Sequence, residues 1–277
     1  MADDESLAKK LDRELSRHST ARGSDSEGGE YGSIQEMWLS QGVVQEGRNE
    51  DWYERAADYY EENCDATLNG VLGGFAAITE VDLAGSRAFL EKLKTDRPKL
   101  VWSDGAGCEC GAGIGRVTKG LLLPLGVSRC DLVESSPRLL ASAPDYIGDP
   151  DAQLCRFYCE GLQNWTPPKD TYTIVWIQWV LCYLTDADIV SFLKRCGEGL
   201  KPHGVIVLKE NSCQEDNFVL DYHDASVTRS LPYWLQLIEE AGLSVCLQEI
   251  QDDFPDELFS VPILALEVKR NETQTPE

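Results

Sequence analysis

Residues 108–116 read CECGAGIGR, and residues 133–144 read VESSPRLLASAP. The first stretch places Gly111, Gly113 and Gly115 after a strand-like run and before a helical one. In an open α/β sheet such a turn lies above the carboxyl ends of the strands, where ligands bind. The spacing G-x-G-x-G followed by Arg116 matches neither the dinucleotide motif G-x-G-x-x-G nor a P-loop ending in G-K-[ST]. Glu134 would also repel a phosphate placed beside it.

The second stretch restricts the class of possible ligands further. Glu134 ends the second predicted strand, where a carboxylate can accept both hydroxyls of a ribose. The glycines let the backbone approach an adenosyl group closely, and Arg116 with a nearby helix N-terminus suits a carboxylate. An adenosyl ligand with a carboxylate and no phosphate is S-adenosyl-L-methionine. The alternative is a tight strand-to-helix turn without a ligand.

Strands and helices alternate from about residue 105. Hydrophobic patterning predicts strands over 106–110, 129–134, 155–160, 172–178 and 204–211. It predicts helices over 115–125, 136–146, 186–199 and 226–241, followed by a hairpin of SVCLQEIQ and VPILALEV. Alternation of this kind indicates an α/β fold, with a mostly parallel sheet covered on both faces and an antiparallel strand at or near one edge.

The N-terminal part has a different character. Residues 1–45 are polar and rich in Gly and Ser, so we expect a disordered acidic and polar tail there. Helical patterns over NEDWYERAADYYEEN and SRAFLEKLK, joined by the glycine-rich TLNGVLGGFAAIT, predict an N-terminal helical lid over 46–100. The catalytic domain is then expected over 46–277.

Composition excludes several classes of function. The formal net charge of −23 disfavours nucleic acid as a partner and favours a cationic ligand or a Lys/Arg-bearing peptide, although acidity can serve solubility alone. The longest apolar run, YTIVWIQWVLCYL, is too short to cross a membrane. The ten cysteines include no C-x-x-C pair and the three histidines show no ligand spacing, so we expect no metal site and no disulfides. Free cysteines favour a reducing compartment.

Five stretches carry a resemblance to a known family: CGAGIGRVTKGLLLPL, WIQWVLCYLTD, FLKRCGEGLKPHGVIVLKEN, LDYHDASVTRS and FPDELFSVPILAL. Together they resemble the α-N-terminal protein methyltransferases, which methylate the free amine of proteins that begin Xaa-Pro-Lys/Arg. The resemblance implies a class I methyltransferase (Rossmann-like) fold, with a seven-stranded mostly parallel sheet and an antiparallel C-terminal hairpin. It also implies S-adenosyl-L-methionine as cofactor and protein N-terminal peptides as partners. We expect a monomer or weak dimer in the cytoplasm, with the nucleus as a second location.

The resemblance also implies roles for individual positions. The cofactor would be held by Gly111, Gly113, Arg116, Glu134, Leu162, Gln163 and Gln178. The peptide would be bound by Tyr60, Leu72, Trp179, Tyr183, Asp221, Ser226 and Phe259, with Asp224 and Asn211 as the catalytic pair. Five positions depart from the family pattern. Glu109 and Glu134 replace Asp and keep the charge, whereas Tyr60 stands for Trp, Tyr183 for His and Phe259 for Tyr.

The chemistry of these side chains is consistent with an amine substrate. An α-amine has a pKa of about 7.7 to 8.0, so only a minority is neutral at physiological pH. Asp224, hydrogen-bonded by Asn211, can hold the amine and take its proton. Asp221 can bind a second cation, and Trp179 can stack on a proline. The alternative for DYHDAS is a helix N-cap at Ser226 with solvated acids. Two other functions stay open: methylation of a small-molecule amine, and an inactive cofactor-binding module.

Overall fold

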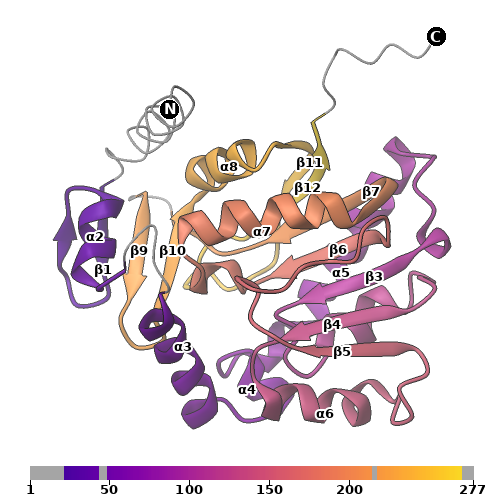
Figure 1. The fold of residues 1–277 in the computed structure, drawn as a ribbon, viewed down its shortest axis with the longest axis horizontal. Helices are drawn as coiled ribbons and strands as arrows, with labels where there is room; N and C mark the ends of the chain where they lie inside the picture. The colour runs from indigo at the N-terminus through magenta and orange to yellow at the C-terminus, as the bar shows by residue number, and fades with distance from the viewer. Residues whose placement is uncertain (1–21, 44–48, 214–216, 270–277) are drawn as a thin grey trace, which may run out of the picture.

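A computed structural model describes residues 22–43, 49–213 and 217–269 (Figure 1). Its strands are β1 (Gly23–Asp25), β2 (Glu30–Tyr31), β3 (Ala106–Cys110), β4 (Cys130–Glu134), β5 (Cys155–Cys159), β6 (Tyr172–Gln178), β7 (Leu200–Lys209), β8 (Ser212–Cys213), β9 (Phe218–Asp221), β10 (Ser226–Ser230), β11 (Leu243–Ile250) and β12 (Pro262–Val268). Its α-helices are α2 (Ile34–Ser40), α3 (Glu50–Asn63), α4 (Leu68–Val71), α5 (Thr79–Asp96), α6 (Pro137–Ile147), α7 (Asp186–Gly199) and α8 (Leu231–Glu240). Shorter helical turns are η1 (Ala76–Ile78), η2 (Trp102–Asp104), η3 (Thr118–Leu122) and η4 (Leu181–Tyr183).

The main sheet has seven strands in the order β11-β12-β7-β6-β3-β4-β5. The strands from β7 to β5 run parallel, and β12 and β11 complete the sheet as an antiparallel hairpin. The prediction of a seven-stranded, mostly parallel sheet with this hairpin is confirmed. The chain leaves β3 toward β4 and β5 and then returns to β6 on the other side. This reversal creates a crevice between β3 and β6 at their carboxyl ends, which is where such sheets bind ligands.

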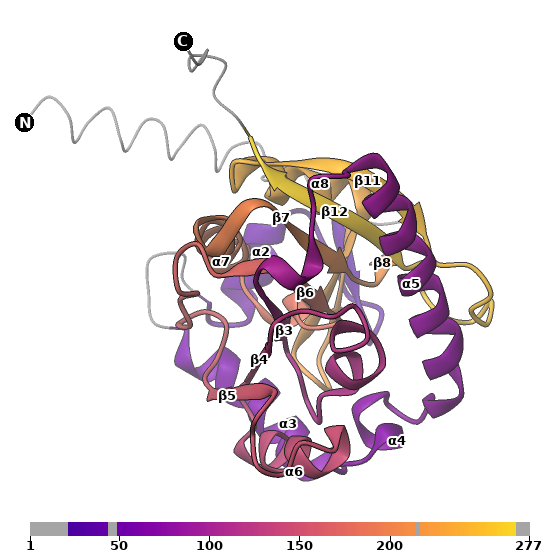
Figure 2. The same ribbon diagram turned by 90° about the vertical axis from the view of Figure 1, so that its right-hand side faces the viewer.

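Helices cover both faces of this sheet. On one face Phe192 of α7 and Leu237 of α8 pack in a single core with Ile177 of β6. On the other face Phe89 of α5 packs in a second core with Trp176. Figure 2 shows α5 and α7 on opposite sides of the strands. The prediction of a lid over all of 46–100 therefore needs correction, because α5 is a covering layer of the sheet.

A second, smaller sheet has the order β2-β1-β9-β10-β8. Strands β9 and β10 form an antiparallel hairpin, and β1 pairs with β9 in parallel from Gly23 opposite Phe218. The helix predicted over 226–241 is thus wrong in its first turn: residues 226–230 are strand β10, and α8 begins at Leu231. Val227 and Thr228 are β-branched, and both pair with β9, which favours the extended backbone.

The predicted tail is also wrong for residues 22–43. After β1 and β2, helix α2 buries Ile34, Met37 and Trp38 against the main core. The Trp38 indole donates a hydrogen bond to Asp186 at 3.3 Å and packs edge-on against Trp52, with ring centroids 5.0 Å apart. Burial of these apolar side chains offsets the entropy cost of ordering a Gly- and Ser-rich segment. Residues 1–21, 44 and 45 of the predicted tail lie outside the described residues.

In the part of the chain that the structure describes, no helix is both long and apolar enough to cross a membrane. The same residues contain no cluster of three or more His, Cys, Asp or Glu side chains suited to a metal ion. All ten cysteines lie among the described residues, and none of them forms a disulfide bond.

Candidate active site

The glycine turn follows β3 as predicted and has a left-handed backbone conformation that only glycine adopts readily. Gly111 and Gly115 have φ values of +68° and +83°. A Cβ at Gly111 would lie 2.5 Å from the Val180 side chain, and one at Gly115 would lie 2.5 Å from Ile147. The turn therefore brings bare backbone against the carboxyl end of β6.

The Glu109 side chain fixes the backbone that follows this turn. Its carboxylate accepts hydrogen bonds from the backbone N–H groups of Val117 at 3.2 Å and Thr118 at 2.6 Å. These are among the first N–H groups of the helical segment after the turn, which continues as the π-helical η3 in place of the regular helix predicted over 115–125. Burial raises the pKa of Glu109 to about 7, opposed by its hydrogen bonds to Thr118 and by the charge of Arg116. The acidic residue at the head of the motif is thus a structural cap.

Glu134 lies at the carboxyl end of β4, one strand away from the turn. Its carboxylate accepts hydrogen bonds from Gly113 N–H at 2.9 Å and from Ser136 N–H at 2.8 Å. Ser136 in turn caps α6 through Leu139 N–H. Glu134 is therefore fixed beside the glycine turn.

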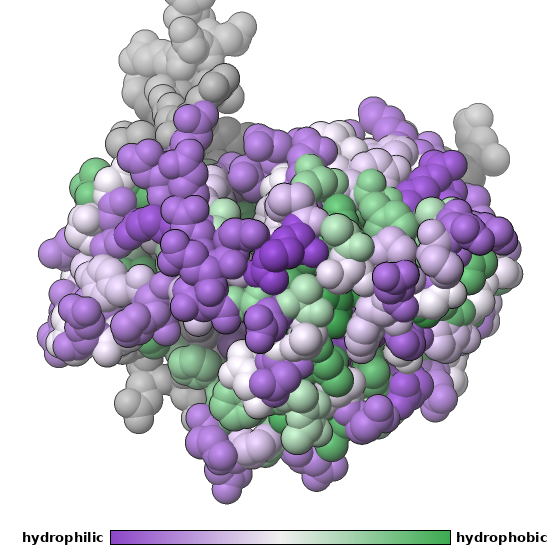
Figure 3. Space-filling view, turned by 90° about the horizontal axis from the view of Figure 1, so that it is seen from below, coloured by the Kyte–Doolittle hydropathy of each residue, from purple (hydrophilic) through white to green (hydrophobic). Residues whose placement is uncertain are grey.

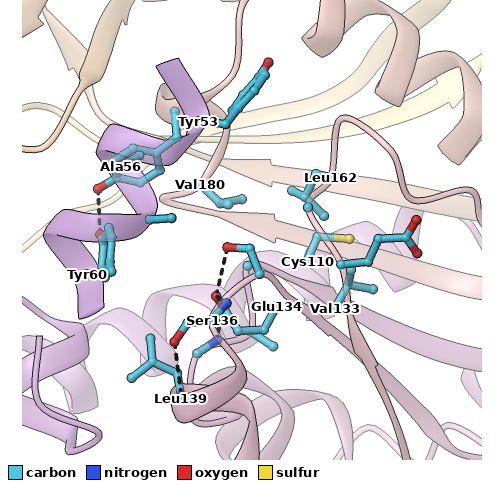
Figure 4. A pocket seen from close by; sticks show the side chains of 18 of the residues that line it. Tyr53, Ala56, Tyr60, Cys110, Val133, Glu134, Ser136, Leu139, Leu162 and Val180 are labelled. Atoms are coloured by element: carbon cyan, nitrogen blue, oxygen red, sulfur yellow. Dashed lines mark hydrogen bonds between the residues drawn. The ribbon is translucent and has the colours of Figure 1, made fainter. Parts of the chain in front are cut away.

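A pocket of about 990 Å³ opens above these strand ends. It is lined by all seven residues predicted to hold the cofactor: Gly111, Gly113, Arg116, Glu134, Leu162, Gln163 and Gln178. In Figure 4, Ala56 and Tyr60 from α3 lie across the pocket from Cys110 and Val133 at the ends of β3 and β4. The volume is at the upper end of the range for ligand pockets and accommodates a molecule of nucleoside size with room to spare.

Four of the predicted peptide-binding residues also line the pocket: Tyr60, Leu72, Trp179 and Tyr183. The Trp179 ring lies 5.5 Å from the Arg116 guanidinium carbon, and its indole N–H is buried without a hydrogen-bond partner among the described residues. Tyr60 and Tyr183 share a hydrogen bond of 2.6 Å between their hydroxyl groups. Burial raises the pKa of both phenols above the usual value, so both stay neutral.

Asp224 is joined to the pocket through Tyr183. The Tyr183 hydroxyl donates to one Asp224 oxygen at 3.3 Å, and the Ser226 N–H donates to the other at 3.1 Å. Burial raises the pKa of Asp224, opposed by the hydrogen bonds from Ser226 and Tyr183, while the nearby Asp221 charge raises it further. Asp221 ends β9, Ser226 begins β10 opposite it, and Asp224 lies in the turn between them. The N-cap alternative is therefore wrong, because the turn joins two strands and no helix begins at Ser226.

Two predicted residues are placed differently. Among the described residues, the side chain of Asn211 makes no hydrogen bond to Asp224, and the backbone carbonyl oxygen of Asn211 accepts one from the Trp234 indole at 3.2 Å. The predicted orientation of Asp224 by Asn211 is thus replaced in this structure by Tyr183. Phe259 precedes the bridge between Ser212 and Ser260 and is half-exposed, outside the pocket lining.

Two buried residues behind the pocket, Asp82 and Glu210, were not among the predicted site residues. Glu210 follows β7 and accepts hydrogen bonds from the N–H groups of Val180 and Leu181, each at 2.8 Å, so it holds the loop between Trp179 and Tyr183. Asp82 of α5 accepts hydrogen bonds from Arg116 at 2.7 Å and from Gln178 at 2.8 Å. Glu210 lies within the stretch FLKRCGEGLKPHGVIVLKEN that carries the family resemblance, next to Asn211, whereas Asp82 lies in none of the five stretches.

The pocket opens on the side of the molecule that carries α3 and α6. Figure 3 shows this side, with hydrophobic side chains gathered near the centre and hydrophilic ones around them. Arg138 of α6 donates to the carbonyl oxygen of Tyr60 at 2.9 Å and also to that of Cys64, so it ties the end of α3 to α6. The helical segment around α3 is thus fastened over the pocket at its C-terminal end.

These residues fit S-adenosylmethionine. Bound there, the cofactor would have its ribose beside the Glu134 carboxylate and the glycine turn, and Arg116 would donate to its carboxylate. Within the described part of the chain, the pocket lining contains no second Lys or Arg of the kind that would hold a triphosphate. The fold and the site define a class I methyltransferase that depends on S-adenosylmethionine.

Comparison with known proteins identifies the family. Residues 48–267 match the model of the AdoMet-dependent proline di-methyltransferases. N-terminal Xaa-Pro-Lys N-methyltransferase 1 of Bos taurus is 41% identical over 216 residues, covering 78% of this chain and 95% of the relative. Alpha N-terminal protein methyltransferase 1 of Arabidopsis thaliana is 39% identical over 255 residues, covering 89% and 91%. The chain belongs to this methyltransferase family.

Comparison with solved structures supports the same fold and cofactor. A SAM-dependent methyltransferase of Leishmania major superimposes with a TM-score of 0.79 at 34% identity, covering 90% of this chain and 96% of that one. Phosphoethanolamine N-methyltransferase 1 of Haemonchus contortus, solved with S-adenosylhomocysteine, shares the fold with a TM-score of 0.63 at 14% identity, covering 87% of this chain and 53% of that one. The S-adenosylmethionine cofactor predicted from the glycine turn is confirmed.

Proposed function

We propose that this chain methylates the free α-amino group of protein N-termini of the type Xaa-Pro-Lys or Xaa-Pro-Arg. The observation that carries the proposal is the acidic β9–β10 turn, whose Asp224 is hydrogen-bonded to the pocket-lining Tyr183. The printed names of relatives about 40% identical to this chain specify Xaa-Pro-Lys N-termini, which supports the proposal.

Asp224 is the group we assign to the amine. When bound, S-adenosylmethionine supplies an electrophilic methyl group, and the protein has to present a neutral amine to it. A carboxylate whose pKa is raised by burial is a stronger base than a solvated one, which suits it to take a proton from an ammonium group. Tyr183 orients this carboxylate from the pocket side, and neutral Tyr60 supports Tyr183 from α3.

The second and third residues of the substrate peptide are assigned to two other side chains, Trp179 and Asp221. Trp179 lines the pocket and offers an indole face on which a proline ring can pack. Asp221 ends β9 and uses one carboxylate oxygen to accept the His223 N–H at 2.8 Å. A Lys or Arg at the third substrate position can donate a charge-assisted hydrogen bond to such a carboxylate. The net charge of −23 adds a long-range attraction for basic N-termini.

A peptide assay tests the proposal. A hexapeptide beginning Ser-Pro-Lys is mixed with the protein and S-adenosylmethionine, and its mass is followed over time. We expect gains in steps of one methyl group. The same peptide acetylated at its N-terminus should gain nothing, because its nucleophile is blocked, and replacement of its Lys by Glu should abolish turnover through repulsion by Asp221.

Each other outcome identifies a different function. Methylation of the blocked peptide would move the assignment to a side-chain lysine. Turnover of small amines with none of the peptides would establish a small-molecule enzyme. Cofactor binding without methylation of any amine would establish an inactive binding module.

A further inference from the structure

Asp82 lies at the junction of the cofactor pocket and the sheet. It comes from α5, has no exposed surface and accepts hydrogen bonds from three side chains that are distant in sequence. One oxygen receives Arg116 Nη1 at 2.7 Å, and the other receives Gln178 Nε2 at 2.8 Å and Lys209 Nζ at 2.6 Å. The Lys209 ammonium also donates to the Asp82 carbonyl oxygen at 3.1 Å.

The two pocket-facing members of this cluster are both held from behind. Arg116 and Gln178 line the pocket, whereas Asp82 and Lys209 do not. Each of the two lining side chains has Asp82 as a hydrogen-bond acceptor. Because a guanidinium carries five N–H groups, the single bond to Asp82 leaves Arg116 with donors for a ligand. Asp82 thus fixes the Arg116 side chain and shares the Gln178 amide with the Trp176 indole, which donates to Gln178 Oε1 at 2.8 Å. Asp82 itself does not line the pocket.

The charges of the cluster do not balance. Two cations, Arg116 and Lys209, share one carboxylate, and all three side chains are buried. Glu109 also lies near Arg116, but its carboxylate accepts hydrogen bonds from the N–H groups of the following helical turn and forms no ion pair with Arg116 among the described residues. Burial lowers the pKa of Lys209 to about 8. The charge of Asp82 opposes this decrease, and the charge of Arg116 adds to it. A desolvated excess of positive charge favours the arrival of an anion.

We propose that Asp82 is a positioning residue of the cofactor site, which aims Arg116 and Gln178 into the pocket and, with Lys209, presents one uncompensated positive charge to the carboxylate of S-adenosylmethionine. The inference depends on the cofactor and not on the peptide substrate. Asp82 and Lys209 therefore act on the amino-acid end of the cofactor and leave the adenosine end to Glu134 and the glycine turn.

Two ligands distinguish the positioning role of Asp82 from a purely structural role in anchoring α5. S-adenosylhomocysteine carries the carboxylate, and 5′-methylthioadenosine keeps the adenosine and the thioether but lacks the amino-acid end. A residue that only stabilises the fold changes the affinity for both ligands alike. A residue that serves the carboxylate changes the ratio of the two dissociation constants.

The experiment is calorimetric titration of both ligands into wild-type protein and three variants. Asp82→Asn removes the shared carboxylate, and Lys209→Met removes the excess charge while keeping an unbranched apolar side chain. Glu267→Gln is the matched control, because its 2.6 Å ion pair with Arg97 also ties the end of α5 to the sheet but lies away from the pocket. A thermal melt of each variant reports folding independently.

We expect Asp82→Asn to weaken S-adenosylhomocysteine at least about tenfold and Lys209→Met to weaken it severalfold, the range for hydrogen bonds and charges near an ionised group. Methylthioadenosine should change less than about twofold in both, and Glu267→Gln should change neither ligand. Equal losses for the two ligands, or none, would overturn the proposal. Tighter binding of S-adenosylhomocysteine to Asp82→Asn would show that charge alone matters and would overturn the positioning role. If Asp82→Asn does not fold, Lys209→Met decides by the same ratio.

Discussion

Replacement of Asp224 by Asn is the perturbation that separates chemistry from architecture in the proposed mechanism. The amide has the shape of the carboxylate, and its oxygen can still accept from Ser226 N–H, which is bonded to Asp224 at 3.1 Å. What disappears is the negative charge and the basicity. We therefore expect normal binding of S-adenosylmethionine and a turnover lowered by about 10²- to 10⁴-fold, the range for a lost general base.

The stability of the variant follows from the same burial. The folded pKa of Asp224 is raised above its ordinary value, so its contribution to stability is present at low pH and is lost as the carboxylate ionises. At neutral pH the wild-type protein carries the cost of a partly desolvated charge, and the Asp224→Asn variant does not. The variant should accordingly melt no lower than the wild type at neutral pH.

The pH dependence adds a second signature. Without a base, the variant depends on amine that arrives already neutral, a fraction that grows about sevenfold between pH 7 and pH 9 for an amine pKa near 7.8. The deficit should narrow by up to that factor over this interval. The assay is initial-rate methylation of the Ser-Pro-Lys peptide at several pH values, beside a thermal melt and a cofactor titration. Turnover within threefold of wild type, with a normal melt, would remove Asp224 from the mechanism.

Three further predictions concern the cofactor, a buried acid and the N-terminal segment. Glu134→Ala should weaken S-adenosylmethionine by about 1.5 to 3 kcal/mol, as expected for lost hydrogen bonds to a charged group, and unchanged affinity by calorimetry would sink the ribose assignment. Burial raises the pKa of Glu210 to about 7, so its contribution to stability is present below its ordinary value near 4.5 and is lost as pH rises through 7. The free energy of unfolding of Glu210→Gln, relative to the wild type, should therefore rise by on the order of 3 kcal/mol between pH 5 and pH 8. Denaturant titrations in which the two proteins show parallel pH profiles would contradict this. Trp38→Ala should lower the free energy of unfolding by about 3 to 5 kcal/mol, the range for truncating a buried aromatic side chain. An unchanged melting temperature would contradict the packing of α2 in the core.

The sequence predicted the main sheet well because its strands are short apolar runs between clear turn signals. The bounds predicted for β3 and β6 agree with the structure residue for residue. The glycine turn and Glu134 were accessible for the same reason, since a local motif places them at two neighbouring strand ends.

The errors have a common cause in long-range contacts. Residues 226–230 read as the start of a helix until their pairing with β9 is known, and buried Arg229 is stabilised there by Asp186 at 2.7 Å. Asp82 had no motif because its three partners are distant in sequence and meet it only in the folded chain. Asn211 was assigned to Asp224 by resemblance, whereas Tyr183, a departure from the family pattern, occupies that place.

The parallel pairing of β1 with β9 has a consequence for how the protein is made. Arg22 and Asn217, which are hydrogen-bonded where these strands meet, are 195 positions apart in the chain. At about 5 to 20 residues per second, a ribosome needs roughly 10 to 40 s to synthesise the intervening segment. During that time β1 has no partner strand from β9, although its own hairpin with β2 can form. The turn that carries Asp224 emerges after β3 and β4, so the nascent chain acquires these cofactor-binding strands well before the acid that would receive a substrate amine.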